Sequence, residues 1–313
     1  MDSFIKELTT EQQNENTRDI DLKSTIEILT LINQEDHKVP NVIAAIIPII
    51  AKSADAIVAS FQAGGRLFYF GAGTSGRLGI LDASECPPTY GTDPEMVQGI
   101  IAGGNEAVYR AIEGAEDSKE LGIRDVDSHH IHANDVVIGI AASGRTPYVL
   151  GAMERAKELG AAVIGISNNA DTPMKPLAKY MIEAVVGPET VLGSTRMKSG
   201  TAQKLILNML TTTAMIRIGK VYDNLMVDLN PSNYKLISRA KRLIQMATGA
   251  DDETVEYAYE QANGHVKLAI VMIVANVSAA EASRLLEQAK GYVRDAVKLW
   301  RAEDDNDKHS HPK

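Results

Sequence analysis

The sequence contains a single cysteine, Cys86, among 313 residues. One cysteine excludes a disulfide within the chain and any zinc or iron–sulfur site built from several thiolates. Aromatic side chains are also scarce, with 10 Tyr, 4 Phe and 1 Trp. The hydrophobic core must therefore consist mainly of aliphatic side chains, a composition that suits buried parallel strands covered by helices.

Positive charge is in the minority, because 32 Lys and Arg stand against 41 Asp and Glu. The net charge of -9 argues against nucleic acid as a partner, since it offers no basic surface to a phosphodiester backbone. Residues 1–6 lack the basic start and apolar run of a secretory signal, and no stretch approaches the roughly 20 apolar residues of a membrane span. We therefore expect a cytoplasmic protein that does not bind a membrane.

Short β-rich runs alternate with helix-length segments in the middle of the chain. The predicted strands are residues 67–70, 97–101, 136–140, 162–166 and 181–186. This alternation predicts an α/β fold with a mostly parallel, doubly wound sheet and helices on both faces. In the strand order 2-1-3-4-5, which is common in such folds, the first and third strands are neighbours.

The flanking segments differ in character from this α/β region. Residues 1–40 are polar and are interpreted as an N-terminal arm that packs on another surface, in this chain or in a second one. Apolar residues at helical spacing predict a long helix over residues 40–63, and residues 235–300 show helical periodicity without strands. We therefore predict an arm (1–40), an α/β domain (41–230), a domain of three or four helices (235–300) and a disordered tail (301–313).

The first predicted strand ends in Gly71-Ala72-Gly73-Thr74-Ser75-Gly76, which has the spelling G-x-G-x-x-G. A dinucleotide site also needs an acidic residue at the end of the second strand, but Ile101 is followed by Ala102 and two glycines. The hydroxyls of Thr74 and Ser75 at a helix N-terminus favour a phosphate monoester instead. The alternative is a tight turn in which these hydroxyls only cap the helix.

A second loop of the same kind follows the third predicted strand, with Ser143, Gly144, Arg145 and Thr146. If the first and third strands are neighbours, both hydroxyl-bearing loops face one crevice. Thr146 precedes Pro147, so capping of the next helix would account for Thr146 without a ligand.

A third polar cluster, with Ser194, Thr195, Arg196 and Lys198, precedes a long predicted helix. Cations at a helix N-terminus oppose the helix dipole, so an anion is expected there.

Longer strings identify the family that the chain resembles. Residues 71–79, 82–91, 113–117 and 200–204 resemble the N-acetylmuramic acid 6-phosphate etherase family, and the likeness runs from about Leu8 to the helical end. The resemblance implies a three-layer αβα sugar isomerase (SIS) domain with a five-stranded parallel sheet and a ubiquitin-associated-like helical domain. It also implies a homodimer without metal or organic cofactor. One departure is Ser194-Thr195 in place of two serines, which keeps both hydroxyls.

The activity implied by the resemblance is cleavage of the D-lactyl ether of N-acetylmuramic acid 6-phosphate, giving N-acetylglucosamine 6-phosphate and D-lactate in cell-wall sugar recycling. The ether lies β to the anomeric carbon, so a base can remove the C2 proton while an acid protonates the leaving oxygen, and water then adds back. The resemblance implies Glu85 as the acid and Glu116 as the base. The three polar loops supply the predicted sugar-phosphate site, which consists of Thr74, Ser75, Gly76, Ser143, Arg145, Thr146, Ser194, Thr195, Arg196 and Lys198.

Spacing alone would favour a solvated role for both glutamates. Pro87 and Pro88 predict the end of a helix just after Glu85, and Glu116 stands in an acidic run. Cys86 has no histidine beside it and is interpreted as a buried neighbour rather than a nucleophile.

Two other functions are compatible with such a scaffold. An aldose–ketose isomerase would use similar phosphate loops but no acid aimed at C3, and a non-catalytic sugar-phosphate sensor would lack one of the paired glutamates. The cluster His129, His130 and His132 has the density of a metal site. It precedes the third strand, opposite the strands' carboxyl ends, and a surface loop is the better interpretation.

Overall fold

The structure is a computed structural model that describes residues 8–229 and 234–310, with side chains through residue 304. Residues 1–7 of the predicted arm, the predicted boundary at residue 230 and residues 311–313 of the predicted tail lie outside the described residues. The chain divides into two compact units. One comprises Met1–Ser84 and Pro94–Thr212, and the other comprises Glu85–Asp93 and Thr213–Lys313.

The first unit is built on a five-stranded sheet with the order β2-β1-β3-β4-β5, in which every pair of neighbours is parallel. The strands are β1 (Leu67–Gly71), β2 (Val97–Ile101), β3 (Val136–Ile140), β4 (Ala162–Ser167) and β5 (Tyr180–Glu183). Every residue of β1 and β3 is buried, as expected for central strands covered on both faces. The predicted α/β class, the five strands and their order are confirmed.

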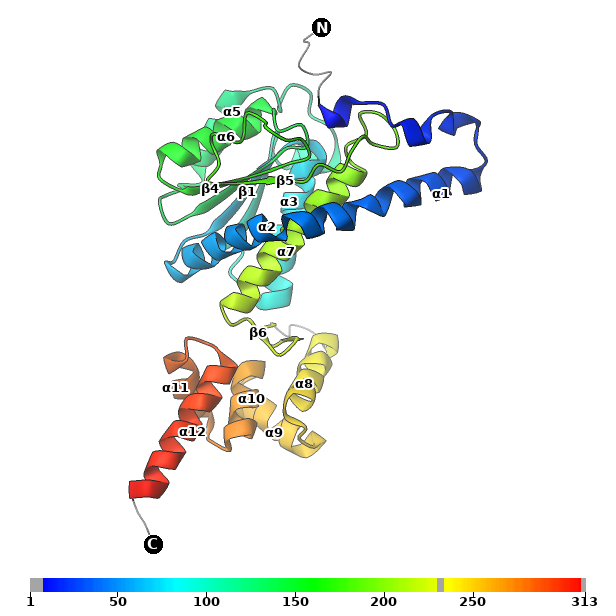
Figure 1. Cartoon of the computed structure of the whole chain (residues 1–313). Helices are drawn as coiled ribbons and strands as arrows, with labels where there is room; N and C mark the ends of the chain where they lie inside the picture. Colours follow the sequence, from blue (N-terminus) through cyan, green and yellow to red (C-terminus); the bar gives the residue numbers. More distant parts are fainter. Residues whose placement is uncertain (1–7, 230–233, 311–313) are drawn as a thin grey trace. The chain divides into compact units, whose positions relative to one another are not determined.

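Helices cover both faces of this sheet, which gives three layers (Figure 1). On one face, α5 (Lys119–Ser128) and α6 (Pro147–Glu158) pack over Phe68, Phe70 and their neighbours. The other face carries α2 (Lys38–Gln62), α3 (Gly73–Tyr90) and α7 (Lys198–Arg217). A short helix, α4 (Glu106–Tyr109), follows β2.

The long helix predicted over residues 40–63 is present but begins earlier, at Lys38. Only His37, itself in helical conformation, separates it from α1 (Thr25–Asp36). Pro40 lies in the first turn of α2, where a missing N–H removes no helical hydrogen bond. A capping box between Ser24 and Glu27 fixes the start of α1.

The segment Thr25–Gln62 is long and apolar enough to cross a membrane, judged by length and composition only. The expectation that no stretch approaches a span was therefore too strict. Helix α2 buries Ile43, Ile50 and Ile57, as a core helix of a globular unit does.

The described part of the N-terminal arm before α1, residues 8–24, contains three short 3-10 segments, η2 (Thr9–Glu11), η3 (Glu15–Thr17) and η4 (Ile20–Leu22). Buried polar side chains attach it to the α/β unit, as predicted for an arm that packs. The Oγ1 of Thr10 accepts a hydrogen bond from Nδ2 of Asn169 at 3.1 Å, and Oγ1 of Thr17 donates to the carbonyl of Thr190 at 2.8 Å.

The second unit contains a two-stranded hairpin followed by five helices in its described residues. These are β6 (Val221–Tyr222), β7 (Leu225–Met226), α8 (Tyr234–Thr248), α9 (Asp252–Gln261), α10 (Val266–Ala275), α11 (Ala279–Gln288) and α12 (Val293–Ser310). Three or four helices were predicted. The additional helix arises from a break that was not predicted, where Lys290 and Gly291 adopt positive φ and separate α11 from α12. A disordered tail was predicted from residue 301, but α12 continues to Ser310. The polar residues that suggested disorder are also compatible with a helix.

Close contact between α5 and α6 requires a glycine at position 122. A Cβ there would lie 2.0 Å from the carbonyl oxygen of Tyr148. We expect Gly122→Ala to lower the free energy of unfolding by about 1–3 kcal/mol through overpacking. Urea denaturation followed by circular dichroism measures this. Arg124→Ala, on an exposed position of the same helix, is the control, and equal stability of the two variants would contradict the packing argument.

Candidate active site

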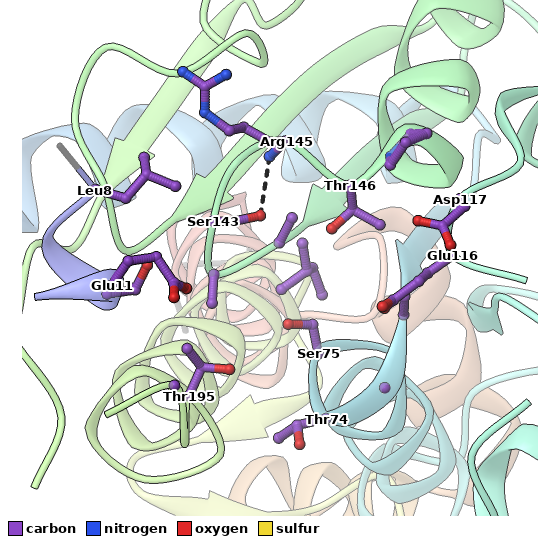
Figure 2. Close-up of a pocket in the computed structure, with 18 residues that line it drawn as sticks. Leu8, Glu11, Thr74, Ser75, Glu116, Asp117, Ser143, Arg145, Thr146 and Thr195 are labelled. Carbon is purple, nitrogen blue, oxygen red and sulfur yellow. Dashed lines mark hydrogen bonds between the residues drawn. The ribbon is translucent and has the colours of Figure 1, made fainter. Parts of the chain in front are cut away.

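A pocket of about 440 Å³ opens at the carboxyl ends of β1 and β3 (Figure 2). These strands pair in register, with Gly71 aligned with Ile140, so the loops that follow them start side by side. The pocket is lined by these two loops, by a third loop, by the arm and by two acidic residues. Its lining includes Ala72, Gly73, Thr74, Ser75, Ser143, Arg145, Thr146, Gly193, Thr195, Leu8, Thr10, Glu11, Glu116 and Asp117.

The first loop turns directly from β1 into α3. A Cβ on Gly71 would lie 2.6 Å from the backbone nitrogen of Gly76, so the strand and the helix can meet only through glycines. Ser75 is buried, and its hydroxyl donates to Oε1 of Gln203 at 2.9 Å. Its orientation is therefore fixed by α7 and not by a capping role. The N–H groups of the first turn of α3 have no partner within the helix and border the pocket.

The second loop adds two hydroxyls to the same pocket. The Oγ of Ser143 accepts from the backbone N–H of Arg145 at 3.2 Å. Thr146 is at the N-cap position of α6 and Pro147 is in its first turn, as predicted, but the Thr146 side chain makes no capping hydrogen bond. Capping therefore does not account for Thr146. The guanidinium of Arg145 points away from Ser75 (Figure 2).

The third cluster contributes one residue to the pocket lining. Thr195 lines the pocket, whereas Ser194, Arg196 and Lys198 do not, and Gly76 of the first loop does not line it either. Lys198 is buried, with 1% of its side chain exposed, and its Nζ lies 2.6 Å from Oε2 of Glu35. The carboxylate of Glu189 accepts from the backbone N–H groups of Lys198 and Ser199 at 2.9 and 2.8 Å. The anion expected at this helix N-terminus is therefore supplied by the chain's own carboxylates, and Lys198 is a structural residue.

Glu35 is the centre of this buried ionic cluster. Its other oxygen, Oε1, accepts from Nζ of Lys38 at 2.6 Å and from Nδ2 of Asn16 at 3.1 Å. Burial alone would raise the pKa of the carboxyl, but the hydrogen bonds from Lys198 and Lys38 outweigh it and lower the pKa to about 2. Helices α1 and α7 are held together through this charge.

The two predicted catalytic glutamates lie in different surroundings. Glu116 lines the pocket, and its carboxylate points into it from the side opposite the arm (Figure 2). The N–H of Tyr148 donates to the Glu116 carbonyl at 3.0 Å, which fixes the loop to the first turn of α6. Within the described residues, the Glu116 carboxylate has no hydrogen-bond or ion-pair partner.

Glu85 does not line this pocket. It is exposed on α3, ten residues after Ser75, which corresponds to about 15 Å along a helix with its rise of about 1.5 Å per residue. The predicted helix end at Pro87 is wrong, because α3 continues through both prolines to Tyr90. It ends where Gly91 takes φ 59° and its N–H donates to the carbonyl of Pro87. Cys86 is buried, as predicted.

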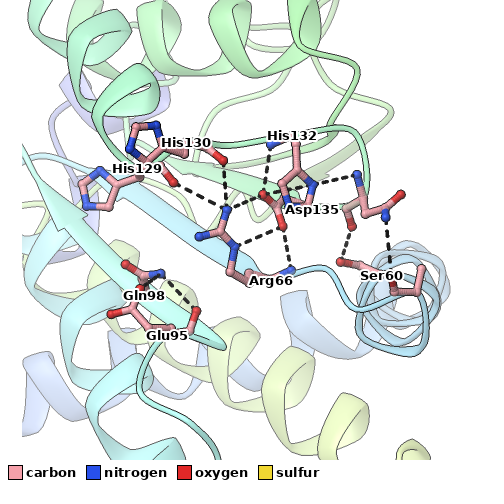
Figure 3. A network of polar contacts seen from close by, with 10 residues as sticks. Ser60, Arg66, Glu95, Gln98, His129, His130, His132 and Asp135 are labelled. Carbon is pink, nitrogen blue, oxygen red and sulfur yellow. Dashed lines mark hydrogen bonds and ion pairs between the residues drawn. The ribbon is translucent and has the colours of Figure 1, made fainter.

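The histidine cluster lies at the amino ends of β1 and β3, in a loop, as predicted (Figure 3). Arg66 donates to the carboxylate of Asp135 at 2.9 Å and to the carbonyl of His130 at 3.0 Å. Asp135 also accepts from the backbone N–H of His132 at 3.0 Å. This network joins the two strand starts. Among the residues that the structure describes, no group of three or more His, Cys, Asp or Glu could hold a metal ion.

Sequence reasoning missed Glu11 and Asp117 as pocket residues. Asp117 follows Glu116 directly, but Glu11 reaches the pocket only because the arm folds back over the α/β unit. The polar run 9–16 indicated an arm that packs, without indicating against what.

Comparison with known proteins agrees with this architecture. The family model of the SIS domain matches residues 122–213, and that of the glucokinase regulatory protein N-terminal SIS domain matches residues 49–157. The α/β unit is thus a SIS domain.

Curated relatives identify one family among the proteins that contain a SIS domain. The chain is 55% identical over 294 residues to an N-acetylmuramic acid 6-phosphate etherase of an Exiguobacterium species, covering 94% of this chain and 100% of that protein. It is 55% identical to N-acetylmuramic acid 6-phosphate etherase 2 of Lactiplantibacillus plantarum, over 94% of this chain and 99% of that protein. The etherase of Caldanaerobacter subterraneus is 54% identical, over 94% and 96% of the two chains. The chain belongs to the N-acetylmuramic acid 6-phosphate etherase family.

The lowered pKa of Glu35 predicts a pH-dependent contribution to stability. Its ionised form is favoured in the folded state, so this contribution is present above the ordinary pKa of 4.5 and is lost as pH falls toward about 2. We expect Glu35→Gln to be less stable than the parent protein at pH 7, with the difference vanishing between pH 4.5 and 2. Denaturation across this pH range measures it. Glu260→Gln, at an exposed position of α9, is the control, and a pH-independent Glu35→Gln difference would contradict the assignment.

Proposed function

We propose that this protein is an N-acetylmuramic acid 6-phosphate etherase. It is a carbon–oxygen lyase that cleaves the D-lactyl ether of its substrate and releases N-acetylglucosamine 6-phosphate and D-lactate, in the recycling of cell-wall sugars. The observation that carries this proposal is the pocket, in which the carboxylate of Glu116, without a partner among the described residues, faces two hydroxyl-bearing loops. Family membership over nearly the whole chain supports it.

The phosphate of the substrate binds at the first turn of α3 and at the surrounding hydroxyls. The unpaired N–H groups and the positive end of the helix dipole favour a dianion there. The hydroxyls of Thr74, Ser143 and Thr146 supply further hydrogen bonds. Local dipoles thus bind the anion despite the net charge of -9.

Glu116 is the base of the elimination. In the open-chain sugar the aldehyde acidifies the C2 proton, which the Glu116 carboxylate takes while an acid protonates the departing lactyl oxygen. The C3–O bond breaks, and D-lactate leaves from an unsaturated aldehyde. Water then adds to C3 and a proton returns to C2, which gives the product sugar. This chemistry needs neither a metal nor an organic cofactor.

Glu85 is the acid, and a homodimer brings it to the reaction. Because Glu85 is about 15 Å along α3 from Ser75, it serves the pocket of a second copy of the chain. Exposed apolar side chains next to and on α1 support association with a second copy, since Leu22 is 79% and Ile26 is 71% exposed.

Two further features belong to this proposal. The helical unit is ubiquitin-associated-like, and the enzyme acts in the cytoplasm on a small sugar phosphate.

Incubation with N-acetylmuramic acid 6-phosphate in heavy water tests the proposed activity. We expect the protein to release lactate and to leave deuterium at C2 of N-acetylglucosamine 6-phosphate. Glu116→Gln is expected to slow both events by about 10²–10⁴-fold, because the base is lost. Glu120→Gln, exposed on α5, serves as the control. Absence of both lactate and exchange with the unaltered protein would overturn the etherase proposal, and an isomerase or a sensor would give no lactate.

Mixing two inactive variants tests the sharing of the site. Glu85→Ala is expected to exchange the C2 hydrogen but to release no lactate. After subunit exchange, an equal mixture of Glu85→Ala and Glu116→Gln is expected to recover about a quarter of the parent activity, since half of the dimers then hold one intact site. No recovery in a mixture shown to contain heterodimers would contradict supply of Glu85 by the partner.

A further inference from the structure

A smaller cavity of about 210 Å³ adjoins the pocket on the far side of Glu116. Both cavities share Ala72, Gly73 and Glu116 in their walls. Glu116 therefore stands between the two cavities. A ligand that extends past this residue enters the smaller one.

The walls of the smaller cavity are apolar except for a few charged groups. Ala102, Ala107 and Ile112 provide the apolar surface. The charged members besides Glu116 are Arg77, Arg110 and Glu113, and Glu113 is exposed.

The two arginines differ in how their charge is compensated. Arg110 is 68% exposed and is paired with Glu106 at 2.8 Å. Arg77 comes from α3 and is half-buried, and its Nε donates to the carbonyl of Val108 at 2.8 Å. Among the described residues, no carboxylate pairs with Arg77, and its two terminal nitrogens have no hydrogen-bond partner. The Nε edge of the guanidinium is thus fixed by the backbone, while its two terminal nitrogens can donate to the two oxygens of a carboxylate.

The shape of the substrate matches this arrangement. Its phosphate is on C6, the proton removed by the base is on C2, and the lactyl ether is on the adjacent C3. With the phosphate among the hydroxyl loops and C2 beside Glu116, the lactyl group extends past Glu116. It carries a methyl group and a carboxylate. The methyl group matches the alanine-rich walls, and the carboxylate matches the terminal nitrogens of Arg77, which have no partner among the described residues.

We propose that Arg77 binds the carboxylate of the substrate's lactyl group in the cavity beside Glu116, and thereby selects the ether over sugar phosphates that lack this group. The inference rests on the proposed function for the identity of the substrate. Arg77 is a specificity-determining residue, because it contacts the group that leaves and not the reacting atoms.

The experiment compares two ligands that differ in the lactyl group. Arg77→Met is expected to raise KM for N-acetylmuramic acid 6-phosphate about 10- to 100-fold, the effect of losing a hydrogen bond between charged groups. The dissociation constant of N-acetylglucosamine 6-phosphate, measured by calorimetry, is expected to change by less than about twofold, since this ligand makes no such contact. The KM of Arg77→Lys for N-acetylmuramic acid 6-phosphate is expected to lie between those of the parent protein and Arg77→Met, because an ammonium keeps the charge but not the two parallel donors. Arg124→Met is the matched control on an exposed position.

Two results would overturn the inference. An unchanged KM in Arg77→Met would show that the guanidinium does not contact substrate. Equal weakening of both ligands would show that Arg77 acts only through its bond to Val108. If the parent protein releases no lactate, the etherase proposal fails, but the inference remains testable by calorimetry. The parent must then bind the lactyl-bearing sugar phosphate more tightly than the other, and Arg77→Met must remove that difference.

Discussion

The pairing of β1 with β3 is the constraint on which the pocket depends. These strands are separated by 64 residues of chain containing β2, yet they lie in register at the centre of the sheet. Parallel neighbours end at the same edge, so the loops that follow them must share one crevice. Each loop leads into a helix, α3 or α6, which directs two helix N-termini and their hydroxyls to the same space. Gly71 and Gly76 make this possible by letting the strand and α3 approach without a Cβ between them.

Charge in this protein is compensated locally. The N-terminus of α7 carries a lysine, which opposes the helix dipole, but the carboxylates of Glu35 and Glu189 surround it. That cluster belongs to the structure and leaves the hydroxyl loops to bind an anion from solution. Arg77 differs from Lys198, because no carboxylate among the described residues pairs with it. Such an uncompensated cation indicates a ligand more clearly than the overall charge does.

Short-range patterns predicted the fold well. Apolar runs in β1 and β3 identified buried strands. The hydroxyl-bearing loops after these strands indicated a common crevice, because doubly wound sheets use a small set of strand orders. The same patterns failed for Lys198, since its partner Glu35 is 163 residues away in the sequence and only the tertiary structure brings them together. They failed for Pro87 and Pro88, because α3 continues through both prolines and ends only where Gly91 takes a positive φ and donates its N–H to the carbonyl of Pro87. Glu11 was missed because an arm without regular periodicity does not reveal where it folds back.

The central claim is that the crevice between the β1 and β3 loops holds the sugar phosphate with C2 beside residue 116. A crystal structure of Glu116→Gln with N-acetylmuramic acid 6-phosphate bound tests it most directly. The account predicts that the phosphate oxygens lie within hydrogen-bond distance of the first-turn N–H groups of α3 and of the Ser143 and Thr146 hydroxyls. C2 should face the side chain at position 116. A phosphate bound elsewhere, for example against Lys220 and Lys267 of the helical unit, would contradict the account.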